Sequence, residues 1–346
     1  MARQNLEKIL KLYDYQVPKK LIAQKPTLPR DKAKLLVYER QIKKLQLDRF
    51  FNLPKYLPKN SVLVFNQTKV LPARLELTKP SGGKIKILYI RKEKGVIWAL
   101  CEKNLTLGEK YKINNRLYFT LNSKQNNRYL FKPSFPIKKL ESILVKYGLA
   151  PLPLYIKHSP LTEVQRKAQY QTIFAKIPGS IAAPTASLHF TKNLMNKLKK
   201  RGIKITFVTL HVNLGTFAPL TEKHLKTKKL HSEFFEIDKK TAQILNVAKQ
   251  SHQPIIAVGT TVARSLESSA VNQKLDNLVG DTKLFIQPGY KFKFVDGLIT
   301  NFHVPRSSLM MLVSALTGRK ELLSVYRQAI ANKFRFFSFG DGMLVL

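Results

Sequence analysis

The sequence predicts an α/β main domain, a mixed sheet or barrel-like core with helices, that carries an inserted small all-β barrel-like domain. Strand and helix patterns alternate through the second half of the chain, which is typical of α/β folds. From about Lys79 to Lys146, short runs of alternating hydrophobicity such as KIKILYI and NRLYFTL are separated by turn residues, which indicates a small barrel. We therefore expect a discontinuous catalytic domain over 1–75 and 151–346, and an inserted β domain over 76–150.

The elements of the first half are short. Short helices and turns are expected near the start of the chain. The segment NSVLVFNQTKVLPARLEL predicts a buried strand over Ser61–Phe65, then a polar turn, then a second strand that ends near Leu77. After the inserted domain, YGLAPLPLYI is expected to lead back into the main domain.

The second half predicts buried strands and amphipathic helices in alternation. Strands are expected in the segments GSIAAP, KITFVTLHVNL, PIIAVGT, TKLFIQPGY and KFVDGLITNF. Helices are expected in TKNLMNKLKKRG, TAQILNVAKQ, TVARSLESS and RSSLMMLVSALTG. Thr191 is the expected N-cap of the first of these helices and Gly202 its stop, and the last is expected to end at Gly318 with Pro305 in its first turn.

The charge of the chain is strongly positive. Its 346 residues include 61 Lys and Arg against 21 Asp and Glu, a formal net charge of +40. Such a field attracts polyanions, and nucleic acid is the expected partner because each neutralised phosphate releases a counterion. The alternative is a generally lysine-rich composition that serves only solvation.

Several classes of protein have no support in the sequence. Cys101 is the single cysteine, so there is no disulfide framework and no thiolate metal cluster. No apolar run is long enough to span a membrane, and the first residues contain no apolar signal-peptide core. HExxH, GxGxxG, P-loop and GxSxG patterns are all missing. We expect a protein of the reducing cytoplasm that binds no membrane and needs no metal, and no obligate protein partner is evident.

A group of polar residues comes directly after each of five predicted strands. The groups are Asn66, Thr68 and Lys69; Thr185, Ser187 and His189; His211, Asn213 and Thr216; Thr260, Thr261, Arg264 and Glu267; and Thr300, Asn301, His303, Arg306, Ser307 and Ser308. In α/β folds, ligands bind at the carboxyl ends of strands. We therefore expect these groups to share one pocket. The alternative for each group is that it only caps the next helix.

Three histidines, His189, His211 and His303, lie in these polar groups. Histidine is the side chain whose unperturbed pKa lies near neutrality, so each is a candidate for proton transfer. The alternative is that each is a satisfied structural residue.

With these motifs in view, the chain resembles the S-adenosylmethionine:tRNA ribosyltransferase-isomerase family of queuosine biosynthesis. The matching segments span nearly the whole chain in order: Tyr13–Val37, Val64–Leu75, Tyr170–Ala175, Gly179–Thr191, Leu210–Leu220, His231–Phe235, Ile256–Ser268, Phe285–Gly318 and Phe334–Leu346. The resemblance implies transfer and isomerisation of the ribosyl moiety of S-adenosylmethionine onto the 7-aminomethyl-7-deazaguanine wobble base of tRNA. The product would be epoxyqueuosine, with adenine and methionine released. It also implies an α/β domain with an inserted β-barrel.

The reaction implied by the resemblance needs a base beside the sulfonium and an acid for the departure of adenine. The catalytic candidates are His189, His303, Asp31 and Glu267, and which is the base and which the acid stays open. The candidates for binding S-adenosylmethionine, the co-substrate, and a tRNA that carries the precursor 7-deazaguanine base are Arg30, Asn66, Thr68, Arg74, Thr185, His211, Thr216, Thr260, Arg264, Asn301, Arg306, Arg335 and Asp341.

The chain departs from the family pattern at a few positions. Ser187 and Asn213 stand where glycine is usual, Phe334 and Phe339 replace tyrosines, and Gly342 replaces an alanine. Two other functions remain open on the residues. One is a non-catalytic basic RNA-binding protein that retains the fold, and the other is an ordinary RNA methyltransferase.

Overall fold

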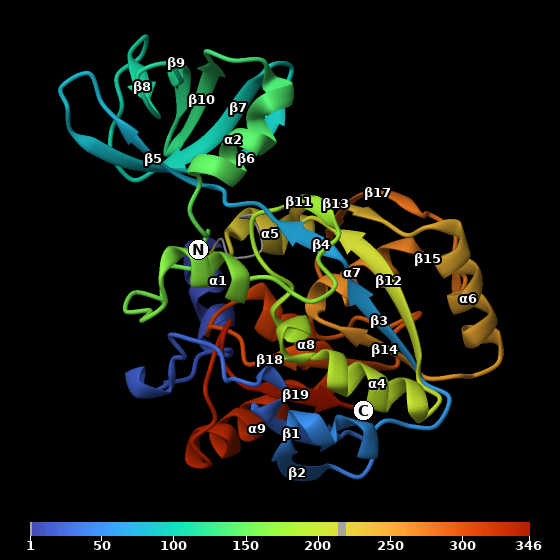
Figure 1. The fold of residues 1–346 in the computed structure, drawn as a ribbon. Coiled ribbons are helices and arrows are strands. Elements are labelled where there is room, and N and C mark those ends of the chain that lie inside the picture. Colours follow the sequence, from blue (N-terminus) through green and yellow to red (C-terminus); the bar gives the residue numbers. More distant parts are fainter. Residues whose placement is uncertain (1, 214–218) are drawn as a thin grey trace.

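The structure is a computed structural model that describes residues 2–213 and 219–346. It contains a large mixed sheet with helices and, apart from it, a closed antiparallel β-barrel (Figure 1). The predicted fold class is therefore confirmed.

The large sheet has, in the described ranges, the strand order β17-β13-β12-β3-β14-β18-β19-β1-β2. Strands β12, β3, β14 and β18 run parallel to one another at its centre, and β19 is antiparallel to β18. The strands are β1 (Lys34–Glu39), β2 (Lys44–Arg49), β3 (Val62–Asn66), β12 (Lys204–Leu210), β13 (Lys229–Glu236), β14 (Ile255–Val258), β17 (Val279–Leu284), β18 (Gly297–Asn301) and β19 (Gly342–Val345).

Both faces of this sheet are buried, because successive side chains of a strand point to opposite faces. Val62 and Val64 of β3 join one hydrophobic cluster, and Leu63 and Phe65 join another on the opposite face. The first cluster includes side chains from α6 (Lys239–Gln250), α7 (Thr260–Ser269), α8 (Ser308–Thr317) and α9 (Arg319–Ala331). The second includes side chains from η3 (Phe50–Lys55), η5 (Thr185–His189) and α4 (Lys192–Lys200).

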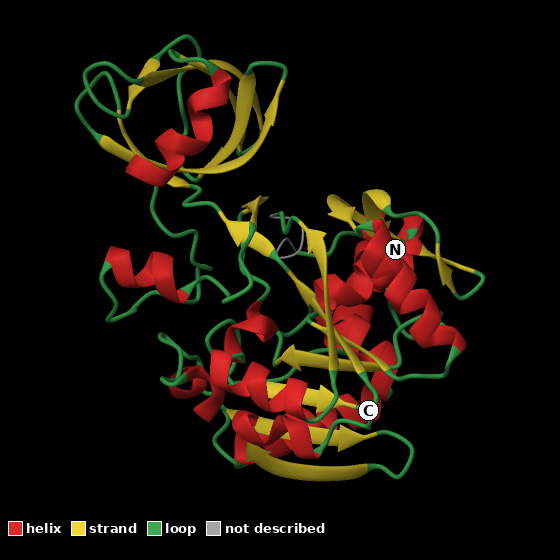
Figure 2. Cartoon of the chain, turned by 45° about the vertical axis from the view of Figure 1, so that its right-hand side comes forward, coloured by secondary structure: helices red, strands yellow, loops and turns green. Residues whose placement is uncertain are grey.

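The barrel closes in the order β10-β7-β6-β5-β8-β9, with every neighbouring pair antiparallel. Its strands are β5 (Arg74–Thr78), β6 (Lys84–Glu93), β7 (Val96–Cys101), β8 (Lys110–Lys112), β9 (Tyr118–Gln125) and β10 (Arg128–Pro133). Helix α2 (Leu140–Tyr147) lies against the barrel, and three of its apolar side chains join the barrel core (Figure 2).

The chain enters and leaves the barrel side by side. The backbone N–H of Leu149 donates to the carbonyl of Arg74 at 2.7 Å, and the N–H of Arg74 donates back at 3.3 Å. The division into folding units at residues 75 and 150 stays a prediction, and this paired stem is consistent with it.

Smaller elements complete the described part of the chain. They are α1 (Ala2–Lys11), α3 (Glu163–Gln169), α5 (Glu222–Thr227), η1 (Lys19–Leu21), η2 (Arg30–Lys32), η4 (Ile137–Lys139), the pair β4 (Thr68–Val70) and β11 (Ile177–Ser180), and the pair β15 (Ala270–Val271) and β16 (Lys274–Leu275). No helix in 2–213 or 219–346 has the length and apolar character needed to cross a membrane.

The predicted helix ends are partly correct. Thr191 caps α4, its hydroxyl accepting from the N–H of Leu194 at 3.1 Å, as expected. The prediction that Pro305 lies in the first turn of the last helix was wrong. Helix α8 begins at Ser308, because the hydroxyl of Ser307 caps it and accepts from Met310 N–H at 3.3 Å, while the positive φ of Arg306 keeps the preceding turn out of the helix.

Candidate active site

The polar groups that follow the central strands meet at one edge of the sheet. Because β12, β3, β14 and β18 are parallel, their carboxyl ends, from Asn66 to Asn301, lie at the same edge. Strand β19 runs the opposite way, and its first residue, Gly342, pairs with Asn301, so the segment before β19 reaches this edge too.

A pocket of about 600 Å³, counting the space open to solvent, lies at this edge. It is lined by the start of η5, the turn into α7, the turn from β18 to α8, and a segment near residue 337. Four of the predicted binding or catalytic residues line it, namely Thr185, Thr260, Asn301 and His303.

His303 is held in one orientation. Its Nε2 lies 2.8 Å from the hydroxyl of Thr300, while Tyr15 donates to its backbone carbonyl and its N–H donates to the hydroxyl of Tyr326 at 2.9 Å. Burial lowers the pKa of His303 to about 3, so the imidazole is neutral at pH 7. With Nε2 on Thr300, Nδ1 is the ring nitrogen left for the pocket that His303 lines.

Two buried polar atoms at this edge make no hydrogen bond of normal geometry, although their side chains interact, since Asn301 partly offsets the lowering of the pKa of His189 by burial, and only Asn301 lines the pocket. One is Nε2 of His189, whose ring stacks on Phe50 at 4.6 Å between centroids. The other is Oδ1 of Asn301, whose amide nitrogen donates to the carbonyl of Phe337 at 3.0 Å. Such an unsatisfied atom costs about 1–3 kcal/mol, so its presence beside a pocket favours a ligand that supplies the missing bond.

His189 is also a neutral imidazole. Burial, and then the positive charges of Arg335 and Arg30, lower the pKa of His189 to about 3. Gly342 makes its packing possible, because a Cβ at that position would lie 2.7 Å from the ring of Phe50.

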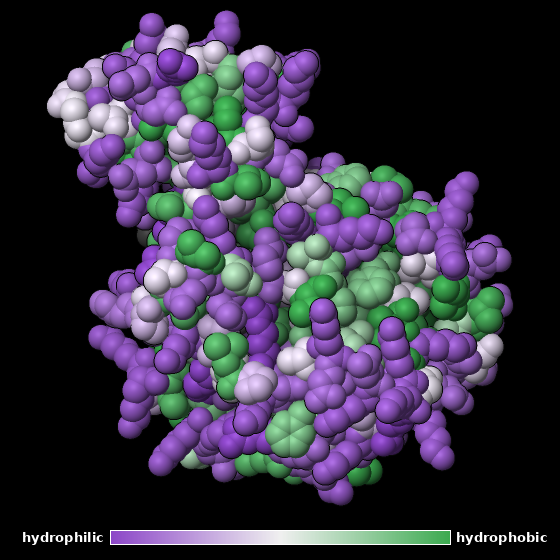
Figure 3. Space-filling model, viewed as in Figure 1, coloured by the Kyte–Doolittle hydropathy of each residue, from purple (hydrophilic) through white to green (hydrophobic). Residues whose placement is uncertain are grey.

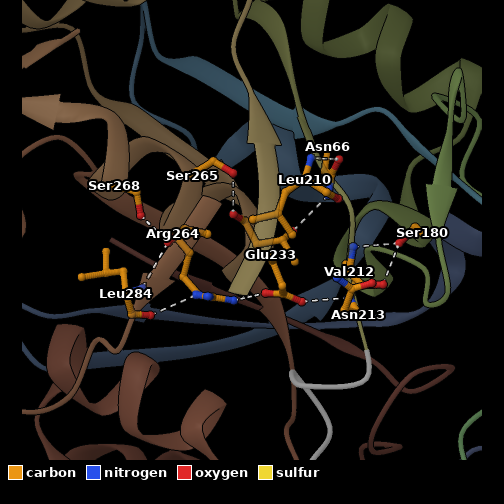
Figure 4. Close-up of polar contacts among 12 residues, drawn as sticks. Asn66, Ser180, Leu210, Val212, Asn213, Glu233, Arg264, Ser265, Ser268 and Leu284 are labelled. Atoms are coloured by element: carbon orange, nitrogen blue, oxygen red, sulfur yellow. Dashed lines mark hydrogen bonds and ion pairs between the residues drawn. The ribbon is translucent and has the colours of Figure 1, made fainter. Parts of the chain in front are cut away.

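A second polar network lies beside the first pocket (Figure 4). Arg264 of α7 donates from Nε to the carbonyl of Leu284 at 3.1 Å, pairs through Nη1 with Glu233 of β13, and leaves Nη2 buried without a partner. Glu233 also accepts from the N–H of Asn213 at 2.9 Å. These two side chains line a smaller pocket of about 320 Å³, again counting open space, and Leu309 lines both pockets.

Asn66, Thr68 and His211 join the ends of β3 and β12. Oδ1 of Asn66 accepts from the N–H groups of Leu210 and Thr68, each at 3.1 Å, and its amide donates to the carbonyl of Leu210 at 2.9 Å. The hydroxyl of Thr68 lies 2.8 Å from Nδ1 of His211, whose pKa is lowered by burial. These residues position the sheet edge and do not line the pocket.

The predicted carboxylates have protein partners. Asp341 accepts from the N–H groups of Lys34 at 3.0 Å and Arg335 at 2.7 Å, and so ties the strands next to the pocket together. Asp31 accepts from the hydroxyl of Thr191 at 2.6 Å. Glu267 accepts four hydrogen bonds, from Tyr290 and from three backbone N–H groups of residues 293–295, and lines neither of the two pockets at the edge.

Four predicted arginines contact the protein. Arg30 donates to the backbone carbonyls of residues 169, 171 and 188, and burial lowers its pKa to about 10. Arg335 donates to the carbonyl of Lys25 at 3.1 Å and to Thr27. Arg74 donates to the carbonyl of Leu152 at 3.1 Å beside the barrel stem, and Arg306 pairs with Asp14 and Glu7 on the surface. Thr216 lies outside the described residues.

The sequence analysis missed several residues at this edge. Tyr155 and Ser338 line the main pocket and share a hydrogen bond of 2.6 Å. Phe337 also lines it, with a φ of +71°, which is unusual for a bulky residue. The backbone of Phe337 is held in this conformation by bonds to Phe302 and Asn301. Among the described residues, no group of three or more His, Cys, Asp or Glu could hold a metal ion.

The fold and the pocket define an α/β protein whose candidate ligand site lies where parallel strands end, which is where ligands bind in such folds. The model of a family described as "Queuosine biosynthesis protein" matches residues 10–345. The chain belongs to this family.

Relatives named S-adenosylmethionine:tRNA ribosyltransferase-isomerase align with almost the whole chain. One from Carboxydothermus hydrogenoformans is 42% identical over 97% of this chain and 99% of its own length. One from Aquifex aeolicus is 41% identical over 96% of this chain and 98% of its own length. A crystal structure of S-adenosylmethionine tRNA ribosyltransferase from Thermotoga maritima is 32% identical, covers 97% of this chain and 100% of its own, and has a TM-score of 0.56.

Proposed function

We propose that this chain is an S-adenosylmethionine:tRNA ribosyltransferase-isomerase. It transfers and isomerises the ribosyl moiety of S-adenosylmethionine onto 7-aminomethyl-7-deazaguanine at the wobble position of tRNA, which gives epoxyqueuosine and releases adenine and methionine. The observation that carries the proposal is the 42% identity to a relative of this name over 97% of the chain. The pocket at the sheet edge supports it, because it lies at the carboxyl ends of parallel strands, where ligands bind in α/β folds. We place the reaction in the cytoplasm, as the composition predicts.

His303 is the proposed base of this reaction. The reaction requires removal of a proton beside the sulfonium, and a neutral imidazole is able to accept it. The bond between Nε2 and Thr300 at 2.8 Å fixes the ring, and donation from Nε2–H to that hydroxyl leaves the lone pair of Nδ1 for the pocket. The depressed pKa of His303 favours the role of base over that of acid in the free enzyme.

Asn301 is proposed to bind a polar group of the substrate, and His189, which interacts with Asn301, is proposed to position it. Oδ1 of Asn301 makes no hydrogen bond of normal geometry to the protein, and nucleobases and ribose present donors that match it. Three other predicted binding residues, Asn66, Thr68 and Asp341, act in this proposal by fixing the backbone at the sheet edge.

The net charge of +40 supports tRNA as the partner. Hydrophilic residues cover most of the face seen in Figure 3. The anticodon is a loop, so its wobble base is already outside a duplex and can enter a pocket at modest cost.

The release of adenine tests the proposal. The protein is incubated with S-adenosylmethionine and tRNA that carries the precursor base, and free adenine and methionine are measured against a control without tRNA. We expect both products in equal amounts. Adenine at the level of the control would favour the non-catalytic RNA-binding alternative, and S-adenosylhomocysteine as the product would identify a methyltransferase.

A further inference from the structure

The smaller pocket beside the main one has no part of the substrate assigned to it so far. Its polar wall is the buried pair of Arg264 and Glu233, with His231 and Ser308 next to it. Its apolar wall is formed by Leu230, Ile286, Leu309 and Leu312. Leu309 belongs to both pockets, so the two pockets adjoin at this side chain.

We propose that the smaller pocket binds the amino-acid end of S-adenosylmethionine, and that Nη2 of Arg264 donates to its α-carboxylate. This inference rests on the proposed function, which supplies the identity of the ligand. The ribosyl unit and adenine then lie in the main pocket, and the sulfonium lies near Leu309 between the two.

The first argument is the unsatisfied donor. Arg264 is 4% exposed, and its other two nitrogens bind Leu284 and Glu233, while Nη2 has no partner in the structure. A guanidinium presents its N–H groups in a fixed fork that matches a carboxylate. A carboxylate in the smaller pocket would therefore satisfy a donor that folding alone leaves unpaired.

The second argument is the pairing of opposite charges. The amino-acid end of S-adenosylmethionine carries a carboxylate and an ammonium, with the sulfonium close by. The positive Arg264 and the negative Glu233 are placed side by side in the same wall, and the charge of Glu233 favours the two cationic groups of the ligand.

The third argument is the apolar wall. Two methylene groups separate the sulfur of S-adenosylmethionine from the carbon that bears its charged groups. Leu309 and Leu312 line the pocket together with the charged pair, so these methylene groups find apolar contacts on the way to Arg264.

Decarboxylated S-adenosylmethionine tests the inference, because it lacks the carboxylate and keeps the ammonium and sulfonium. The dissociation constants of the two compounds are measured by calorimetry with the full chain. We expect the decarboxylated compound to bind roughly 10–100-fold more weakly, the effect of one hydrogen bond between charged groups. Equal affinities would overturn the inference, and this comparison needs no variant.

A double variant, Arg264→Gln with Glu233→Gln, tests whether the preference for the carboxylate arises at Arg264. It replaces the buried ion pair by neutral groups of similar shape and leaves no charge buried alone. We expect its preference for the intact compound to fall to about twofold or less, since the charged hydrogen bond is gone. Arg40→Gln is the matched control, because Arg40 is half-buried and binds the carbonyls of Asp296 and Leu346. It should keep the wild-type preference.

The outcomes separate this inference from the proposed function. A folded double variant that retains the full preference, or that loses affinity for tRNA while it keeps the preference, would contradict the role of Arg264. Absence of adenine release together with a clear preference for the carboxylate would instead remove the proposed activity and leave the subsite standing. If the double variant fails to fold, the ratio of the two affinities in the wild-type protein decides.

Discussion

At the scale of single residues, the site depends on histidines that are neutral because they are enclosed. His189 and His303 both have a pKa near 3, and burial is the main cause in each case. A neutral ring has a lone pair that is able to accept a proton, and its orientation is set by the bond it makes. For His303 this bond is to Thr300, while two tyrosines, Tyr15 and Tyr326, hold its backbone independently of the side chain.

The variant His303→Ala tests the role of this ring. We expect adenine release to fall by at least about a hundredfold, the usual contribution of a general base, while the affinity for tRNA changes little. The backbone bonds to Tyr15 and Tyr326 remain, so the turn should keep its shape. His158→Ala, at an exposed position, is the control and should keep full turnover. Full turnover in His303→Ala would end the candidacy of His303.

The same burial predicts that acid destabilises the protein. The pKa of each histidine is lower in the folded state than the unfolded value near 6.5, so the unfolded state binds more protons as the pH falls. Their contribution to stability is complete above about pH 6.5 and is lost between there and the folded pKa near 3. From pH 7 to pH 5 we expect a loss of about 2 kcal/mol for each histidine in the free energy of unfolding.

Urea unfolding at pH 7 and at pH 5 measures this loss. The variant His303→Gln removes one titrating ring and retains a group able to bond with Thr300, so its loss should be smaller than that of the wild type by about 2 kcal/mol. An identical pH dependence in both proteins would show that His303 is not held neutral.

Pocket-lining residues could be predicted from the sequence where they come directly after a predicted strand. Thr185, Thr260, Asn301 and His303 line the candidate pocket, because the polar groups after the strands share one edge; their roles stay a prediction. Glu233 was missed because it lies within a strand that continues past the end of its partner, where burial depends on tertiary contacts. Tyr155 was missed because its segment reads as a linker.

At the scale of elements, the edge of the sheet is held by close packing between short segments. Strands β4 and β11 pair in parallel beside the ends of β3 and β12, and Gly179 of β11 faces the ring of His211. The φ of Gly179 is +149°, and a Cβ there would lie 2.7 Å from that ring. The hydrogen bond between His211 and Thr68 therefore depends on a residue without a side chain.

The variant Gly179→Ala should be destabilising for both reasons. We expect a loss of about 2–4 kcal/mol in the free energy of unfolding, from backbone strain and from overpacking against His211. Gly202→Ala is the matched control, since Gly202 also has a positive φ but has no atom within 4 Å of the added Cβ. It should lose only about 1–2 kcal/mol, the backbone part alone. Equal losses in the two variants would show that contact with the ring of His211 contributes nothing.

Most helices and strands could be predicted from hydrophobic periodicity. The wrong predictions concern the ends of elements, where two sequence signals favour different end points. Pro305 suits a first helical turn, yet Ser307 is the stronger N-cap, so α8 begins three residues later than the proline. The segment TKLFIQPGY was predicted as one strand, but β17 ends at Leu284. Glu267 draws the N–H groups of residues 293–295, which lie after this segment, to the end of α7.

At the scale of the whole molecule, the fold class was predictable and the order of strands was not. The alternation of strands and helices indicates an α/β sheet. The position of β19 between β18 and β1 results from pairing between the two ends of the chain, which no local pattern reports. The pocket depends on that pairing, because it brings the segment near Phe337 beside Asn301.

The net charge of +40 predicts a strong dependence of tRNA binding on salt. Each phosphate contact releases a counterion, so we expect the affinity to fall at least about tenfold between 50 and 200 mM salt. Filter binding or fluorescence titration at several salt concentrations gives the slope. A flat response would mean that the basic residues are not directed at tRNA.

The paired stem of the barrel has a consequence for how such a chain can change over time. Arg74 and Leu149 are joined by two backbone hydrogen bonds, so the inserted segment begins and ends at neighbouring residues. If the barrel were removed, a tight turn could join these two neighbouring residues, and the path of the chain through the large sheet would not change. The outer surface of the barrel is thus free to change without disturbing the edge of the large sheet.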